Sequence, residues 1–323
     1  MKRTWMILGC ALALGMGLTA CDDGGTPDPT DSGVTPEEDG SMMMMEDSGP
    51  GPSTPVVMAF DEDTGMEVAA DFSCLGSATA PTGSGEESVT VTAVDFFNSM
   101  PVGGLEIQFF PGNVPSTDGT CGADCTSVTS SAEGTAMVDY DRGSWFAYRV
   151  VAGDGTQPGM EPKPYVQVIQ ANATSGTLNA VSRSTVNTIT SVLGIRQDVE
   201  NGILTGGTAD CQGRALVNAQ VRLFDSAGQI PFGTGSTDTK PFYFSGGTPL
   251  PRPTETDASG LYGVGNVPIP ADSVVRVEIW GSTAEGEPQT ILGCETVQVV
   301  PDGITVLSIG PLRGDGPGGC SGE

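Results

Sequence analysis

Strict alternation of apolar and polar residues recurs along this chain and constrains its fold more than any other feature. The alternating segments are bounded by Gly, Asp, Asn and Pro, and six are clear: VTVTAV (89–94), LEIQF (105–109), YVQVI (165–169), AQVRL (219–223), VVRVEIW (274–280) and ITVLSI (304–309). A period of two places alternate side chains on a buried face and on a solvated face of a sheet. The sequence therefore predicts an all-β fold.

The alternating part of the chain also contains an internal repeat. A strand ending in Asp, a turn and an alternating strand occur at VDFFNSMPVGGLEIQFF (94–110) and again at ADCQGRALVNAQVRLFD (209–225). In each copy a variable loop and a turn ending in Gly follow. Roughly 250 residues of this texture suffice for two domains. We therefore expect two tandem β-sandwich domains of the immunoglobulin or transthyretin type, at 68–180 and 203–313.

One segment between the two copies has helical spacing instead. In STVNTITSVLGI (184–195), Val186, Ile189, Val192 and Leu193 recur at helical intervals, and Gly194 is placed to end the helix. We expect a short helix within a connector at 181–202. A Gly-rich tail, 314–323, ends the chain.

The second copy resembles a carboxypeptidase regulatory-like domain, which is a transthyretin-like β-sandwich. The resemblance covers residues 203–310 and is carried by GTADCQGRALVNAQVRL, TDASGLYGVGNVP and VVRVEIW. Asn218 and Ala215 stand where that family usually has Gly and Pro. The residues that fit its pattern are Asp210, Gly213, Leu216, Ala219, Val221, Leu223, Thr256, Asp257, Gly260 and Tyr262. The resemblance implies a fold and no peptidase activity.

The residues of this motif also have a direct physical interpretation. Asp257 is suited to accept backbone N–H bonds across a turn, and Gly260 supplies the positive φ that a three-residue hairpin loop needs. Tyr262, two residues later, is expected to point inward. All three residues build the fold and none brings chemistry.

The N-terminal residues have the features of a secretory leader. Two basic residues precede an uncharged, apolar run at 5–18, which is typical of a signal peptide and short for a membrane span. The tetrapeptide LTAC (18–21) resembles a bacterial lipobox, which implies cleavage at 1–20 and lipid on Cys21. An ordinary secretory signal with a chance cysteine is the alternative. We expect a lipid-anchored protein of the cell envelope, at the outer membrane or cell surface rather than the inner membrane.

The next segment is acidic and of low complexity. Residues 22–55 contain nine acids and no base among many Gly, Pro, Ser and Thr residues. Such a composition buries too little apolar surface to offset chain entropy. We expect the lipidated cysteine to be followed by a disordered acidic linker, spanning 21–67 in all. The whole chain has a formal net charge of −27, which disfavours nucleic acid as a partner.

The cysteine content fits an oxidising compartment. With Cys10 in the leader and Cys21 lipidated, six of the eight cysteines remain and allow 15 pairings. A disulfide between Cys211 and Cys294 is favoured, because both fall on strands of one predicted domain. A small loop closed by the two cysteines at 121 and 125 is a further option. It would leave Cys74 and Cys320 without local partners.

Catalytic chemistry has little support in the sequence. The chain contains no histidine, which excludes Ser-His-Asp and Cys-His nucleophile systems and histidine zinc sites. Neither a phosphate-binding P-loop nor the D-x-D-x-D-G spacing of a calcium loop is present. We therefore expect no enzyme activity, no cofactor and no metal site.

Two interpretations of the role follow. The first is a structural or protein-contact role for the β-sandwich modules, with envelope proteins as partners. The alternative is a carbohydrate-binding or adhesion module, in which Phe242, Tyr243 and Phe244 of the loop at 230–253 would stack on sugars. The competing possibility for these aromatics is that they fold back and anchor the loop.

Overall fold

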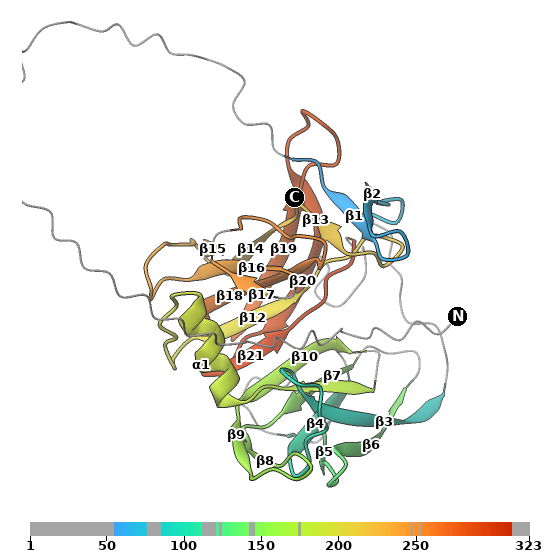
Figure 1. Cartoon of the computed structure of the whole chain (residues 1–323), viewed down its shortest axis with the longest axis vertical. Helices are drawn as coiled ribbons and strands as arrows, with labels where there is room; N and C mark the ends of the chain where they lie inside the picture. Colours follow the sequence, from blue (N-terminus) through green and yellow to red (C-terminus); the bar gives the residue numbers. More distant parts are fainter. Residues whose placement is uncertain are drawn as a thin grey trace, which may run out of the picture. The chain divides into compact units, whose positions relative to one another are not determined.

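The structure is a computed structural model, and it describes residues 55–75, 85–111, 121–122, 125–141, 146–173, 176–246, 248–251 and 253–311. Within these ranges strands dominate, which confirms the predicted all-β fold (Figure 1). The elements are β1 (Met58–Asp61), β2 (Met66–Ala69), β3 (Glu86–Asp95), β4 (Glu106–Pro111), β5 (Thr126–Thr129), β6 (Thr135–Asp141), β7 (Phe146–Val150), β8 (Gly153–Gly155), β9 (Lys163–Tyr165), β10 (Gln167–Ala173), β11 (Thr177–Ala180), α1 (Arg183–Val192), β12 (Gly202–Gly207), β13 (Leu216–Val217), β14 (Gln220–Asp225), β15 (Gly228–Gln229), β16 (Lys240–Ser245), β17 (Thr248–Leu250), β18 (Leu261–Val267), β19 (Val274–Gly281), β20 (Thr290–Gln298) and β21 (Gly303–Val306).

The six alternating segments fall on β3, β4, β10, β14, β19 and β21. One nine-stranded sheet, in the order β17-β16-β18-β12-β21-β10-β7-β4-β5, links the two halves of the chain. Its central strand β21 comes from the end of the sequence and pairs in parallel with both β10 and β12. The two predicted sandwiches therefore share a sheet.

The two hydrophobic cores lie on opposite faces of this shared sheet. Ile304 of β21 and its partner Ile203 of β12 pack against the first core. The next residue, Thr305, pairs with Leu204, which belongs to the second core. Successive side chains of a strand point to opposite faces, so the flanking sheets cover opposite sides. The three-stranded sheet β11-β3-β6 closes the first core, and the four-stranded sheet β15-β14-β19-β20 closes the second.

Each core draws almost entirely on one predicted domain range. The first core is built mainly from residues 91–186 and the second mainly from residues 204–309. The exact boundaries at 68–180 and 203–313 stay a prediction, because the shared sheet has no break between the halves.

The residues before the first sandwich belong to the second one. Strand β1 pairs with β13, and Val57 is 2% exposed within the second core. The predicted linker range 21–67 therefore extends too far, since ordered strands begin at Met58. Val57 and Ala59 are buried, as alternate residues of a paired strand are. The strand that pairs with β1 lies about 160 residues later in the sequence, so no neighbouring residue indicates that this segment is ordered. Residues 22–54 and the tail at 314–323 lie outside the described ranges.

The predicted connector helix is present as α1. The Ser182 side chain accepts a hydrogen bond from the backbone N–H of Thr185 and so caps the N-terminus. Gly194 follows the helix with φ 62°, as expected for a C-terminal stop. Leu193 is buried, whereas Val192 is 57% exposed and lies off the buried face.

Candidate functional site

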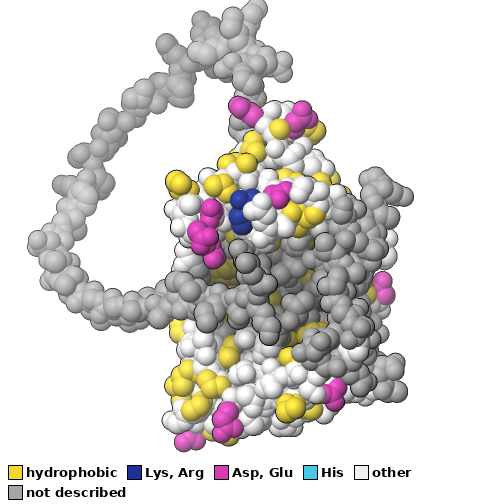
Figure 2. Space-filling model, turned by 90° about the vertical axis from the view of Figure 1, so that its right-hand side faces the viewer, with side chains coloured by type: hydrophobic (Ala, Val, Ile, Leu, Met, Phe, Trp, Pro, Cys, Tyr) yellow, Lys and Arg dark blue, Asp and Glu magenta, His cyan; other side chains and the backbone are white. Residues whose placement is uncertain are grey.

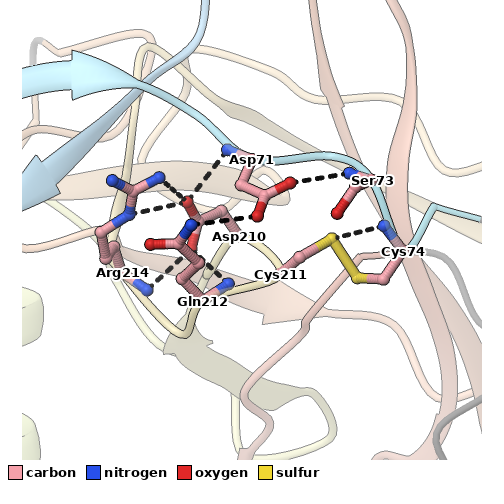
Figure 3. Close-up of a disulfide and its surroundings, with 7 residues drawn as sticks. All are labelled: Asp71, Ser73, Cys74, Asp210, Cys211, Gln212 and Arg214. Atoms are coloured by element: carbon pink, nitrogen blue, oxygen red, sulfur yellow. Dashed lines mark hydrogen bonds and ion pairs between the residues drawn. A yellow bond between two sulfur atoms is a disulfide. The ribbon is translucent and has the colours of Figure 1, made fainter.

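A cluster around one disulfide joins the segment at 55–75 to the second sandwich (Figure 3). Cys74 and Cys211 form this disulfide, with Cα atoms 5.7 Å apart and a sequence separation of 137. The backbone N–H of Cys211 donates to the carbonyl oxygen of Asp71 at 2.9 Å. We call this arrangement the clamp, and its members are Asp71, Ser73, Cys74, Asp210, Cys211, Gln212 and Arg214.

The buried carboxylate of Asp210 organises the clamp. Its side chain is fully buried, and it accepts backbone N–H bonds from Gln212 and Arg214, both at 2.9 Å. The Arg214 guanidinium donates to the other oxygen at 2.9 and 2.6 Å, and the N–H of Asp71 donates to it at 3.1 Å. Asp210 therefore satisfies donors from both segments that the disulfide joins. Both oxygens of Asp210 already accept hydrogen bonds within the fold, so this carboxylate is unsuited to accept a proton from a substrate.

Asp71 supplies a second carboxylate at the edge of the clamp. Its oxygens accept bonds from the Ser73 N–H at 2.9 Å and from the Gln212 side-chain amide at 3.1 Å. Bonding to Ser73, with a further contribution from Gln212, lowers the pKa of Asp71 below its ordinary value. The charged form of Asp71 therefore fits the folded clamp.

Asp95 holds the corresponding place in the first copy of the repeat. It is 1% exposed, and it accepts a hydrogen bond from the Tyr165 hydroxyl at 3.0 Å and an ion pair from Lys163 at 2.9 Å. Burial, together with the charge of Asp95, raises the pKa of Tyr165 well above its ordinary value. The two copies thus use the same buried aspartate with different cations. Neither aspartate lies beside a free nucleophile or base within the described residues.

A shared hydroxyl group supports the repeat that the sequence predicts. In the second copy, Thr256 Oγ1 accepts the N–H of Ala219 at 3.0 Å and donates to the carbonyl oxygen of Leu216 at 2.7 Å. In the first copy, Ser130 Oγ makes the equivalent two bonds at 3.0 and 3.1 Å. The sequence signal for Ser130 is its place at the start of SSAEG (130–134), which corresponds to Thr256 at the start of TDASG (256–260).

The turn residues of the second copy behave as expected. Asp257 accepts the N–H of Ser259 at 2.8 Å and that of Gly246 at 3.1 Å. Gly260 has φ 63°. Tyr262 is fully buried, its hydroxyl donates to a backbone carbonyl oxygen at 2.9 Å, and burial raises its pKa well above the ordinary value. These three predictions are confirmed.

The favoured disulfide between Cys211 and Cys294 is wrong. Cys211 pairs with Cys74, and Cys294 is disulfide-bonded to a different residue. The prediction assumed that pairing stays within one contiguous domain, whereas the segment at 55–75 crosses over to the second sandwich. The small loop closed by the cysteines at 121 and 125 is present. Cys21 lies outside the described residues.

The prediction that the aromatic residues at 242–244 form an exposed ligand-binding loop is also wrong. Phe242, Tyr243 and Phe244 lie on β16 and are 4%, 2% and 6% exposed. Tyr243 faces the second core, while the two phenylalanines pack on the other face of the sheet with Leu193 and Ile195. No ring face is left for a sugar, so the carbohydrate alternative loses the residues on which it depended.

The basic side chains of the described residues are largely used within the fold. The ion pairs found there are Lys163–Asp95, Arg183–Asp302, Arg214–Asp210 and Arg276–Glu278. In addition, Arg222 stacks on the Trp280 ring at 4.0 Å. On the face drawn in Figure 2, acidic side chains stand apart from one another and basic ones are seen at one place only. Such a surface offers no cationic patch to an anionic ligand.

Other features of a reactive site are missing from the described part of the chain. It holds no group of three His, Cys, Asp or Glu residues placed to bind a metal ion. An open hollow of about 440 Å³ beside the first copy is lined by Gly103, Gly104, Ser130, Ala132, Thr156, Gln157, Pro158 and Gly159, none of them charged. In the same ranges, no helix has the length and apolarity to cross a membrane.

Fold and clamp together define an all-β protein of two sandwiches joined through one sheet. No family model and no curated protein matches the chain, so the carboxypeptidase regulatory-like resemblance stays a prediction. Among solved structures, the shaft pilin SpaA of Lactobacillus rhamnosus GG is 9% identical, with a TM-score of 0.21 and 70% of this chain and 98% of that chain covered.

Two further pilins show a similar degree of likeness. A streptococcal ancillary pilin is 14% identical, with a TM-score of 0.22 and coverage of 70% of this chain and 69% of its own. The minor pilin GBS52 of Streptococcus agalactiae is 12% identical, with a TM-score of 0.21 and coverage of 69% and 96%. At these TM-scores the likeness carries no conclusion about the role of this chain.

Proposed function

We propose that this chain is a non-catalytic protein of a bacterial cell envelope, anchored by lipid on Cys21. In this proposal the linker after Cys21 carries two joined β-sandwiches that serve a structural or protein-contact role. The outer membrane or cell surface is the expected location.

The observation that carries the proposal is the use of cysteine. Two disulfides are formed among the described residues, and Cys294 is in a third. Disulfides persist in secreted and periplasmic proteins and are rare in the cytosol. This supports export, which the leader and the LTAC motif at 18–21 predict independently.

The chemistry of the buried polar groups supports a non-catalytic role. Asp95 and Asp210 are buried carboxylates at corresponding positions of the two repeat copies, and both are satisfied by turn amides and a neighbouring cation. Catalytic groups are instead held in reach of a substrate.

Lipid anchoring is tested by metabolic labelling in a bacterial host with an alkyne-bearing fatty acid. The unaltered chain is expected to carry label and to sediment with membranes. Cys21→Ser is expected to lose both properties, because the hydroxyl does not form the thioether. Cys10→Ser is the matched control, since it alters the other cysteine of the leader and is expected to keep both. Equal labelling of the Cys21→Ser protein would refute the anchor.

A further inference from the structure

The segment at 56–74 is bound to the second sandwich at both of its ends. At its beginning, Val57 N–H donates to the Ser282 carbonyl oxygen at 2.8 Å, and the Asn218 side chain donates to the Val56 carbonyl oxygen at 2.9 Å. In the middle, β1 pairs with β13. At its end, the clamp adds the Cys74–Cys211 disulfide. This segment is therefore part of the second sandwich, although the first sandwich follows it in the sequence.

All of the first core except Ile304 of β21 lies inside the loop that this disulfide closes. Strands β3 to β11, helix α1 and strand β12 all fall between Cys74 and Cys211. Residues 56–74 belong to the second sandwich, the residues that follow form the first sandwich, and from β12 onward the chain belongs to the second sandwich again. The first sandwich is thus an insertion in the second, closed off by a covalent bond.

From this topology we infer that the Cys74–Cys211 disulfide is a mechanical bypass. A pull between the N-terminal linker and the C-terminal part of the chain passes through residues 55–74, the disulfide and residues 211–311. Residues 75–210, and with them every buried residue of the first core except Ile304, lie outside this covalent path. That such a pull acts on the protein in the cell depends on the proposed membrane anchor. The covalent path itself depends only on the disulfide and the order of the strands in the sequence.

The bypass also limits how far the protein can be stretched. The disulfide hides a separation of 137 residues. At 3.3–3.6 Å per extended residue, this corresponds to about 450–490 Å of hidden contour length. A partner held by the second sandwich would therefore stay close to the membrane even when that sandwich is pulled open. Without the disulfide, the same pull would release the first sandwich as slack chain.

Optical-tweezer stretching of the full mature chain tests this inference. The protein carries Cys21→Ser, so that the result does not depend on lipid, and handles are fused to the two chain ends. The oxidised protein is expected to reach full extension about 450–490 Å earlier than the Cys74→Ser, Cys211→Ser variant. The control variant Cys121→Ser, Cys125→Ser opens a disulfide inside the closed loop and is expected to leave the extension of the oxidised protein unchanged.

A second measurement does not need the double-serine variant to fold. A protease site inserted between residues 76 and 84 cuts the backbone within the closed loop. The cut, oxidised protein is expected to hold force between its handles after full unfolding, and to separate once a dithiol reductant is added. Equal full extension of the oxidised protein and the double-serine variant, or separation of the cut protein before reduction, would overturn the inference.

Discussion

Replacement of the buried Asp210 by Asn is expected to destabilise the fold by about 2–4 kcal/mol. Asp210 is 3% exposed and accepts bonds from three backbone N–H groups and from the Arg214 guanidinium. Asn keeps the size, but an NH₂ group replaces one acceptor oxygen, and Arg214 loses its counter-charge. Breaking a buried ion pair from one side costs about 3–5 kcal/mol. We expect about 1 kcal/mol less than this range, because the Arg214 side chain is 22% exposed and water compensates for part of the loss.

The matched control is Asp302→Asn, which removes the same charge from an exposed pair. The side chains of Arg183 and Asp302 are 36% and 39% exposed, and such pairs contribute about 0–1 kcal/mol. Asp302 has φ 50°, a conformation that Asn also tolerates. Both variants would be compared by urea denaturation followed by circular dichroism, with the slope of the transition held in common. Losses equal to within about 0.5 kcal/mol would refute the argument from burial.

Three further perturbations test other parts of the structure. In the chain-entropy model, loss of the Cys74–Cys211 disulfide, with a sequence separation of 137, is expected to lower the free energy of unfolding by up to about 5 kcal/mol. Loss of the small disulfide loop, with a separation of 4, is expected to lower it by about 2 kcal/mol. Equal losses in denaturant titrations would contradict this dependence on loop length. Burial raises the pKa of Tyr243 from 10.0 to about 12. The unfolded state therefore loses the Tyr243 proton at lower pH than the folded state. The contribution of Tyr243 to the free energy of unfolding is fully present below pH 10 and falls by about 2–3 kcal/mol as the pH rises to 12. Ultraviolet titration of Tyr243→Phe against the unaltered protein isolates this group, and a folded midpoint near 10 would be inconsistent with it. Gly260→Ala is expected to lower the thermal midpoint more than Gly246→Ala does. Both glycines have positive φ, but only the Cβ added at 260 would lie 2.8 Å from a backbone oxygen. Thermal midpoints that fall equally would disprove this steric explanation.

The elements that follow from local pattern were predictable from the sequence. Alternation identified the strands, because the two faces of a strand have different solvation whatever its partner is. The turn around Asp257 and Gly260 followed from side-chain capping and positive φ, which act within a few residues. Helix α1 followed from its spacing and its terminal glycine. In each case the deciding interactions lie close together in the chain.

The errors arose where the deciding contact is distant in the sequence. Phe242 and Phe244 were placed in an exposed loop, because nothing near them shows that Leu193 and Ile195 cover that face of the sheet. Cys294 was given the wrong partner, because disulfide pairing depends on which segments meet in space. These contacts are properties of the assembled layers.

By itself, the sequence determined the strands, the turns, the helix and the exclusion of histidine chemistry, because period, turn residues and composition act locally. The tertiary structure alone decided that one sheet serves two cores on its opposite faces, and that residues 56–74 cross over to the second sandwich. The physical reason is that strand pairing and core burial join residues far apart in the sequence, such as Met58 with Val217 and Val57 with Ser282. Their backbone hydrogen bonds look alike in every strand, so only packing selects the partners.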